Sequence, residues 1–295
     1  MTEIARVGVV GGGLMGAGIA QVCAVAGLDT VIREVSDTLA AKARASIERS
    51  MAKGVEKGKL TADDAQAALA RLRVETELGA LADRDLVIEA IVESLDAKRE
   101  LWRSVDEIAA PAAVFATNTS SLSVAEQAAA TRRGDRFVGL HFFNPVPVLR
   151  LVEVVRSVTT SDATVETAMA FVRRVGKEPI LARDTPGFVV NLLLVPYMLD
   201  AIRAFEGGVA SIADIDVGMQ LGAAMPTGPL SLCDYVGLDT LERVATVLYD
   251  AYRERRYAPP PLLHRMVVSG WLGRKSGRGF YDYAEEPPRP ATIMG

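Results

Sequence analysis

Two histidines, His141 and His264, are the imidazole groups of this 295-residue sequence that can exchange a proton near neutral pH. His141 follows the apolar run 136–140, which predicts a strand, so it should lie where that strand ends. In open α/β sheets, ligands bind beyond the carboxyl ends of the strands. We therefore interpret His141 as a general acid and base. The alternative is a histidine packed beside two phenylalanines for structural reasons, and His264, in a helical run, is predicted to be a surface or structural residue.

A histidine that acts as a base needs a partner that fixes its tautomer and stabilises the imidazolium ion. Glu153 is the best candidate, because it lies in the middle of the aliphatic run 151–155. Burying a carboxylate among aliphatic neighbours is costly unless the carboxylate is paired. We predict that Glu153 is that partner, and the alternative is that Glu153 faces solvent on an alternating strand.

Two further polar positions are candidates for contacts with a ligand. The run 117–121, which includes Asn118 and Ser120, follows a predicted strand and should place its hydroxyl groups at the ligand-binding edge of the sheet. The alternative is an ordinary helix cap before Val124. Asn191 interrupts an apolar helix at 187–199, and its amide needs partners. A substrate carbonyl or hydroxyl is one candidate partner, and a group inside the protein is the other.

A glycine cluster at 11–18 follows a β-branched run and opens a helix. Gly11, Gly13 and Gly16 have the G-x-G-x-x-G spacing of a dinucleotide-binding turn. Gly11 permits the tight turn, Gly13 leaves no Cβ between the backbone and a pyrophosphate, and Gly16 lets the helix lie close to the strand. The helix that begins at Leu14 and Met15 then presents free N–H groups to the phosphates. A flexible turn is the alternative, but a strand before the glycines and an amphipathic helix after them favour dinucleotide binding.

Glu34 ends a second predicted strand about 20 residues after the glycines, where an acidic residue binds the ribose hydroxyls of NAD. Its carboxylate would repel the 2′-phosphate of NADP, so we predict NAD as the cofactor and NADP as less suitable. Arg33, directly before Glu34, weakens this preference.

The elements that must position these residues alternate between strands and helices. Strands are predicted at 85–90, 113–117, 136–140, 151–155 and 178–182, in addition to the two that flank the glycine turn. This alternation predicts a doubly wound, mostly parallel Rossmann-type sheet whose last strands can be mixed in direction. A pair of helices, capped by Ser36 and Thr61 and running through Met51 and Leu72, interrupts the alternation. The lysines of this pair either form a solvated face or contact a ligand.

The run 183–187 marks a predicted boundary between a dinucleotide-binding domain, residues 1–185, and a second domain, residues 186–295. In the second domain long helices are predicted at 188–206, 212–221, 238–253 and 261–269, with no convincing strand. This all-helical domain is too small to bury its leucine, valine and methionine side chains internally. We therefore expect a homodimer interface there.

Composition excludes several other classes of function. The formal net charge is −4, so the sequence predicts neither a nucleic-acid partner nor a membrane surface. Cys23 and Cys233 lie far apart, with no C-x-x-C pair and no cysteine–histidine cluster, which predicts reduced thiols and no structural metal. The sequence begins with a strand rather than with the charged and apolar segments of a signal peptide. We expect a cytoplasmic protein.

Six motifs together resemble one family. They are GGGLMGAGIA at 11–20, EAIVE at 89–93, NTSSL at 118–122, HFFNPV at 141–146, PGFVVN at 186–191 and GRGFY at 277–281. Their order along nearly the whole chain is similar to that of the L-3-hydroxyacyl-CoA dehydrogenases, in particular the single-function bacterial 3-hydroxybutyryl-CoA dehydrogenases. The resemblance implies a nucleotide-binding domain followed by a helical dimerisation domain.

Matching positions carry over the family's functional residues. The resemblance implies an active site of Ser120, His141, Glu153 and Asn191, with Ser120 and Asn191 also contacting the substrate. It implies CoA contacts from Ser50 and Lys57 of the inserted helical pair, so the acyl-CoA substrate would be the ligand of that pair. It also implies that NAD is held by Glu34, Glu93, Lys98, Asn118, Ser120 and Asn144, together with the glycine turn. Leu192 stands where the family usually has arginine, so any salt bridge at that position of the domain junction is in doubt.

The mechanism implied by the resemblance is a proton transfer coupled to a hydride transfer. His141 would remove the proton of the 3-hydroxyl while C3 passes hydride to nicotinamide, and closure of the two domains would complete the site. One alternative is a related dehydrogenase of a free 3-hydroxy acid, such as a sugar acid. The other is a protein that binds the dinucleotide as a sensor and does not turn it over.

Overall fold

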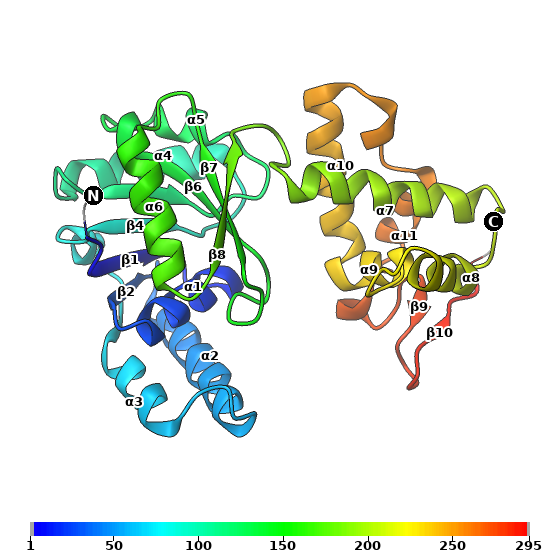
Figure 1. Cartoon of the computed structure of the whole chain (residues 1–295), viewed down its shortest axis with the longest axis horizontal. Coiled ribbons are helices and arrows are strands. Elements are labelled where there is room, and N and C mark those ends of the chain that lie inside the picture. The colour runs from blue at the N-terminus through cyan, green and yellow to red at the C-terminus, as the bar shows by residue number, and fades with distance from the viewer. Residues whose placement is uncertain (1–2, 294–295) are drawn as a thin grey trace. The chain divides into compact units, whose positions relative to one another are not determined.

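The computed structural model describes residues 3–293, and the chain divides into two compact units (Figure 1). The first unit ends at Phe188 and the second begins at Val189. The sequence placed this division between residues 185 and 186. Each unit is described below on its own.

The first unit contains an eight-stranded sheet with the order β3-β2-β1-β4-β5-β6-β7-β8. Its six strands from β3 to β6 are parallel, β7 runs antiparallel to β6, and β8 is parallel to β7. The strands are β1 (Arg6–Val10), β2 (Asp29–Arg33), β3 (Leu72–Glu75), β4 (Leu86–Glu89), β5 (Val114–Thr117), β6 (Phe137–Phe142), β7 (Leu151–Arg156) and β8 (Glu178–Arg183). The doubly wound, mostly parallel sheet predicted from the sequence is confirmed.

The direction changes at β7 because the connection from β6, residues 143–150, contains no crossover helix. Antiparallel pairing places Glu153 of β7 directly opposite His141 of β6. On one face of a sheet, residues in such register have their side chains close together.

Helices cover both faces of this sheet. One buried cluster includes Ile19 of α1 (Leu14–Val25), Ile47 of α2 (Asp37–Glu56), Ala68 of α3 (Ala62–Ala70) and Phe171 of α6 (Asp162–Arg174). A second cluster lies on the other face and includes side chains of α4 (Leu95–Ile108) and α5 (Val124–Ala128), with a stacked pair of rings, Trp102 and Phe115, at its centre. A strand that is apolar along its whole length must be covered on both faces of the sheet, and these two clusters cover them.

The helical pair is confirmed, with Ser36 and Thr61 as the caps of α2 and α3. The prediction that the second helix continues through Leu72 is wrong, because α3 ends at Ala70 and β3 begins at Leu72. β3 is a four-residue edge strand with only Leu72 buried, so its sequence carries little strand signal.

The second unit has five α-helices among its described residues: α7 (Val190–Glu206), α8 (Ile212–Val217), α9 (Pro229–Val236), α10 (Leu238–Tyr252) and α11 (Pro261–Val268). They enclose a core that includes Leu199, Leu230 and Leu248. The sequence missed α9, although Gly228 and Pro229 begin it as N-cap and first helical residue. The expectation of no strand is also wrong, because β9 (Tyr281–Asp282) and β10 (Arg289–Pro290) form a short antiparallel ladder.

Within residues 3–293 no helix combines the length and the apolar character needed to cross a bilayer. The same residues contain no group of three or more histidine, cysteine, aspartate or glutamate side chains arranged to hold a metal ion. Cys23 and Cys233 are both free thiols in buried positions.

Candidate active site

His141 and Glu153 form a buried pair at the carboxyl end of β6. The distance between His141 Nδ1 and Glu153 Oε2 is 2.6 Å, and the two residues are 6% and 0% exposed. A buried carboxylate this close to Nδ1 fixes which ring nitrogen carries the hydrogen and leaves Nε2 for a reacting group. The alternative in which Glu153 faces solvent is therefore excluded.

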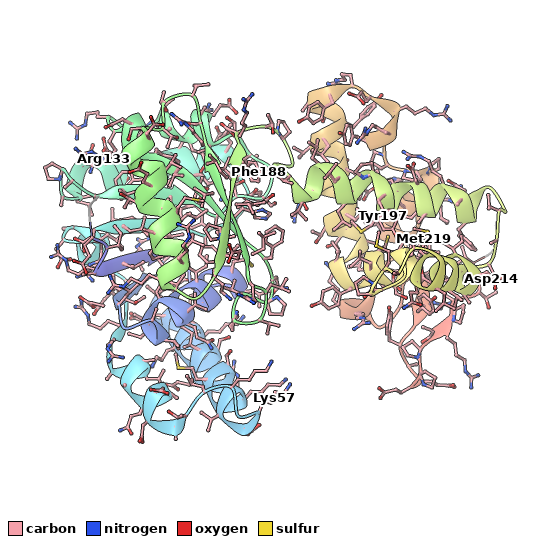
Figure 2. All side chains as sticks on the ribbon, in the orientation of Figure 1. Lys57, Arg133, Phe188, Tyr197, Asp214 and Met219 are labelled. Atoms are coloured by element: carbon pink, nitrogen blue, oxygen red, sulfur yellow. The ribbon has the colours of Figure 1, made fainter. Side chains whose placement is uncertain are left out.

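Two aromatic rings flank the imidazole of His141. The ring centroid of Phe143 lies 4.4 Å away and that of Phe188 lies 5.7 Å away. Phe188, labelled in Figure 2, is the last residue of the first unit, is buried, and has a φ angle of +47°, which is unusual for a residue other than glycine. Aromatic packing around His141 was the structural alternative to a catalytic role. Aromatic packing alone does not require a buried carboxylate next to the imidazole, so the contact with Glu153 favours the catalytic role.

The run 117–121 begins with Thr117, the last residue of β5, and continues beyond the carboxyl end of that strand. Asn118 Oδ1 accepts a hydrogen bond of 2.9 Å from the backbone N–H of Phe142, the neighbour of His141. Ser120 donates its backbone N–H to Glu93 Oε1 at 3.1 Å. Asn118 and Ser120 therefore lie on a segment that is tied both to the strand of His141 and to Glu93.

Glu93 and Lys98, both expected near the cofactor, form an ion pair of 3.1 Å with each other. Lys98 is only 1% exposed and also contacts Glu89 Oε1 at 2.6 Å. Burial alone would raise the pKa of Glu93, but Lys98 and the hydrogen bonds from Thr119 and Ser120 outweigh burial, so this pKa lies below its ordinary value. Glu89 was not singled out from the sequence, although a glutamate directly after the apolar run 86–88 of the strand predicted at 85–90 was a visible signal.

The glycine turn fits a dinucleotide. Gly11 has a φ angle of +93°, which favours glycine, and a Cβ on Gly16 would lie 1.8 Å from the carbonyl oxygen of Gly11. A Cβ on Gly13 would meet nothing within 4 Å, so the turn is open on that side. Gly13 caps α1 without a side-chain hydrogen bond, and the first turn, which contains Leu14 and Met15, has no acidic residue. These features leave N–H groups available for a pyrophosphate.

Glu34 lies beside this turn and is 8% exposed. Its carboxylate accepts hydrogen bonds from the backbone N–H groups of Gly12 and Val35. Arg33, the residue that raised doubt about cofactor preference, donates its Nε to the carbonyl oxygen of Thr76 at 3.2 Å. The guanidinium of Arg33 is therefore hydrogen-bonded to the backbone directly after β3.

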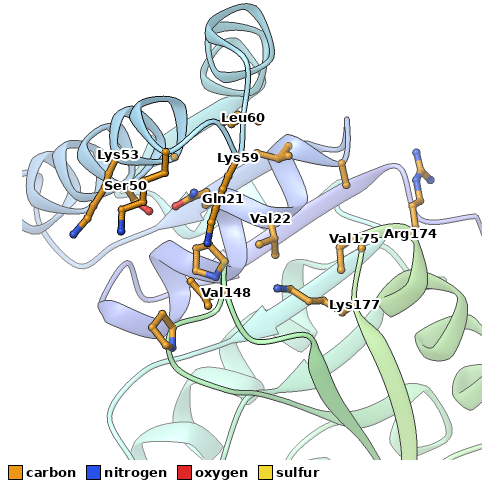
Figure 3. A pocket seen from close by; sticks show the side chains of 17 residues that line it. Gln21, Val22, Ser50, Lys53, Lys59, Leu60, Val148, Arg174, Val175 and Lys177 are labelled. Carbon is orange, nitrogen blue, oxygen red and sulfur yellow. The ribbon is translucent and has the colours of Figure 1, made fainter. Parts of the chain in front are cut away.

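A pocket of about 610 Å³ opens beside α2 (Figure 3). Ser50 and Lys57, the residues expected to contact CoA, both line it, and Lys53 and Lys59 add further positive charge. Its apolar wall comes from Val22, Leu60, Val148 and Val175. The exposed Lys57 lies directly after the end of α2, as Figure 2 shows. This combination suits a ligand with anionic groups and an apolar body.

Lys177, which the sequence did not single out, reaches the wall of the same pocket. Its Nζ donates to the backbone carbonyl oxygens of Val146 and Leu149, both in the connection between β6 and β7. Burial lowers the pKa of Lys177, with a further contribution from Arg150. Lys177 therefore ties down the segment that joins the strand of His141 to the strand of Glu153.

Three other positions that the sequence singled out are described each on its own element. Asn144 is exposed on the connection that follows β6. Asn191 lies in the first turn of α7 in the second unit, and its neighbour Leu192 packs against that unit's core. His264 is exposed, with its Nδ1 2.8 Å from Glu242 Oε1, as expected for a surface residue.

Comparison with known proteins gives matches along nearly the whole chain. Residues 6–185 match the family model "3-hydroxyacyl-CoA dehydrogenase, NAD binding domain", and residues 187–283 match "3-hydroxyacyl-CoA dehydrogenase, C-terminal domain". The chain is 48% identical over 282 residues to 3-hydroxybutyryl-CoA dehydrogenase of Mycobacterium tuberculosis, covering 95% of this chain and 99% of that protein. It is 45% identical over 287 residues to the human mitochondrial hydroxyacyl-coenzyme A dehydrogenase, covering 95% and 91%. The crystal structure of (S)-3-hydroxybutyryl-CoA dehydrogenase PaaH1 from Ralstonia eutropha superposes with a TM-score of 0.92 at 44% identity, covering 96% of this chain and all of that one.

Proposed function

Because this chain belongs to the 3-hydroxyacyl-CoA dehydrogenase family, we propose that it interconverts short-chain (S)-3-hydroxyacyl-CoA and 3-ketoacyl-CoA through the pair His141 and Glu153. It is an oxidoreductase that acts on a CH–OH group, and residues 6–185 form its NAD-binding domain. The observation that carries the proposed chemistry is the buried contact of 2.6 Å between His141 Nδ1 and Glu153 Oε2.

In this proposal His141 Nε2 takes the proton of the substrate 3-hydroxyl during oxidation and returns it during reduction. Glu153 holds the Nδ1 hydrogen and stabilises the imidazolium ion. NAD, when bound, supplies the acceptor or donor of hydride. Phe143 and Phe188 exclude water from the imidazole, which strengthens its electrostatic contact with Glu153. Ser120 binds the reacting oxygen, and Asn191 helps to orient the substrate.

The cofactor roles of the remaining residues are part of the same proposal. The open side at Gly13 and the first turn of α1 would take the pyrophosphate, and Glu34 would take the ribose hydroxyls. Glu93, Lys98, Asn118 and Asn144 would complete the cofactor site. The burial of Lys98 between two carboxylates supports an indirect contribution from this residue.

We place the CoA moiety in the pocket lined by Ser50 and Lys57. An ammonium group at the pocket favours phosphate, and the apolar wall suits the less polar parts of CoA. This pocket favours an acyl-CoA over a free 3-hydroxy acid, because a free acid would leave these contacts unused.

A homodimer and a cytoplasmic location complete the proposal. Large apolar side chains of the second unit are exposed, among them Leu193, Val209 and Leu221, which supports self-association. Both cysteines are free and buried, which is typical of a reducing compartment. The proposed division into a cofactor domain, residues 1–185, and a helical domain, residues 186–295, assigns the dimer contacts to the second domain.

The test is to compare NADH oxidation by the wild-type protein with acetoacetyl-CoA and with free acetoacetate at equal concentrations. We expect turnover with acetoacetyl-CoA and little with the free acid. Lys57→Ala should raise KM for acetoacetyl-CoA by roughly tenfold, since one charged contact is lost. Lys42→Ala, which changes an exposed lysine of α2 outside the pocket, should leave KM unchanged.

Preferred turnover of the free acid would refute the CoA assignment. NADH binding without turnover of any 3-ketoacyl-CoA would favour the sensor alternative.

A further inference from the structure

Glu89 is a fully buried carboxylate that the proposed chemistry does not use. It is the last residue of β4, at the carboxyl edge of the sheet, and its side chain is 0% exposed. Its Oε1 accepts from Lys98 Nζ at 2.6 Å and from the backbone N–H of Ile91 at 2.7 Å. Its Oε2 accepts from the Thr117 hydroxyl at 2.7 Å. Burying an ionised carboxylate is costly, and three donors offset that cost.

One route of contacts runs from Glu89 through Lys98 to the segment that carries Ser120. Lys98 lies between Glu89 and Glu93, with its Nζ 3.1 Å from Glu93 Oε2. Glu93 Oε1 then accepts from the Thr119 hydroxyl and from the backbone N–H of Ser120. The ammonium of Lys98 therefore holds Glu93 in the orientation that orders residues 119 and 120.

A second route reaches the same segment through Thr117. The Thr117 hydroxyl donates to Glu89 Oε2 and accepts from the backbone N–H of Thr119 at 3.2 Å. The Thr119 hydroxyl in turn accepts from the backbone N–H of Leu122 at 2.9 Å. Both oxygens of Glu89 thus contribute to the conformation of residues 117–122.

The far side of this segment is tied to the strand of His141, where Asn118 Oδ1 accepts from the backbone N–H of Phe142. Ser120 therefore lies on a short loop that is held by Glu89 and Glu93 on one side and by β6 on the other. A loop anchored at both sides keeps its functional group in one geometry.

We propose that Glu89 is a positioning residue that sets the location of Ser120 relative to His141, through Lys98 and Glu93 and through Thr117. The inference rests on the proposed function, because it assumes that Ser120 binds the reacting oxygen. It assigns Lys98 to the support of Glu93 rather than to direct contact with a ligand.

Glu89→Gln tests the proposal with almost no change of shape. A glutamine offers one acceptor oxygen and one N–H donor group, so it cannot accept from both Lys98 and Thr117. We expect kcat for acetoacetyl-CoA reduction to fall by roughly 10- to 100-fold, since a displacement of about 1 Å at a reacting group has effects of this size. Exchange of backbone hydrogens in peptides covering 117–123 should become faster.

A double-mutant cycle separates positioning from a general loss of stability. In a Ser120→Ala background, Glu89→Gln should lower kcat by less than about threefold, because the group that Glu89 positions is already gone. The matched control is Asp106→Asn, which removes another buried carboxylate, on α4, that is paired with Arg132 and Arg133. We expect this control to lower the melting temperature without changing kcat or exchange at 117–123.

Additive losses of kcat in the cycle, or unchanged kcat in Glu89→Gln, would overturn the positioning role. If Glu89→Gln does not fold, Thr117→Val serves as the test, because it removes only the second route. This variant should lower kcat several-fold in the wild-type background. In the Ser120→Ala background the same substitution should cause no further loss of kcat. Full kcat in Thr117→Val together with unchanged exchange would count against the proposal. Absence of wild-type turnover with any 3-ketoacyl-CoA would instead contradict the proposed function.

Discussion

Single residues of the first unit carry charge where water is excluded. Glu153 and Glu89 are both 0% exposed, yet each carboxylate has a basic partner 2.6 Å away, His141 for the first and Lys98 for the second. A buried charge of this kind is tolerated because its partner compensates for lost hydration. Replacing the carboxylate by an amide of the same shape therefore tests the charge alone.

Glu153→Gln should lower kcat by roughly 10- to 100-fold, because the imidazolium ion that forms during oxidation loses its counter-charge. The affinity for NADH should change little, since Glu153 faces His141 and not the glycine turn. Steady-state kinetics and NADH fluorescence titration measure the two quantities. An unchanged kcat would show that the pair has only a structural role.

Glu34→Ala should weaken the binding of NADH and should improve the binding of NADPH relative to that of NADH. The variant removes the carboxylate beside Gly12 that would repel a 2′-phosphate. We expect the Kd for NADH divided by the Kd for NADPH to rise roughly tenfold, which is the size of effect expected from the loss of one charged contact. Asp37→Ala, an exposed acid in the first turn of the neighbouring α2, is the matched control. A ratio that stays constant in Glu34→Ala would place the ribose site elsewhere.

The contact between His141 and Glu153 could be expected from the sequence, because an acid inside an aliphatic strand needs a partner. The sequence did not reveal that they lie in direct register, since this depends on the direction of β7. Glu89 and Lys177 were missed for a similar reason. Their partners are backbone groups and side chains that only the folded chain brings near.

At the scale of elements, the strands and helices that position the site were predictable where a capping residue and apolar periodicity agree, as in α2. They were missed where an element is short and half exposed, as in β3, or begins with Pro229 in a loop-like sequence, as in α9. In such elements tertiary contacts outweigh local preference.

The β9–β10 segment of the second unit depends on one carboxylate of α9. Asp234 accepts hydrogen bonds from the backbone N–H groups of Phe280 and Tyr281 at 2.9 Å and from the Tyr283 hydroxyl. A Cβ on Gly279 would lie 2.0 Å from Asp234 Oδ1, so only glycine fits there. Burial raises the pKa of Asp234 to about 6, against the lowering effect of these hydrogen bonds.

A raised pKa makes the folded state bind the proton more tightly than the unfolded state, so the stabilisation is present at low pH and is lost as pH rises through about 6. Between pH 4.5 and 7.5 the free energy of unfolding should therefore fall by about 2 kcal/mol in the wild type relative to Asp234→Asn. Urea unfolding at several pH values measures this difference. Parallel pH curves for the two proteins would contradict the assignment.

At the scale of the whole molecule, the proposal requires that two copies associate through the helical unit. Val217, Leu221 and Met225, spaced four residues apart, are 49%, 82% and 40% exposed. Exposed apolar side chains grouped in this way are typical of an interface.

Light scattering after gel filtration should give twice the mass of one chain for the wild type at micromolar concentration. Leu221→Glu should weaken the dimer by at least roughly tenfold, because a charge would enter an apolar contact. Val158→Glu, which changes a valine of the first unit that is even more exposed than Leu221, should leave the mass unchanged. A monomeric wild type would exclude the dimer.

The most direct test of the central claim is the rate of NADH oxidation with acetoacetyl-CoA by the wild type and by His141→Gln, with NADH binding measured on the same samples. We predict that His141→Gln binds NADH nearly as well as the wild type and turns over roughly 10²–10⁴-fold more slowly, as expected when a general acid and base is lost. Turnover by His141→Gln close to that of the wild type would contradict the assignment of the proton transfer to this residue.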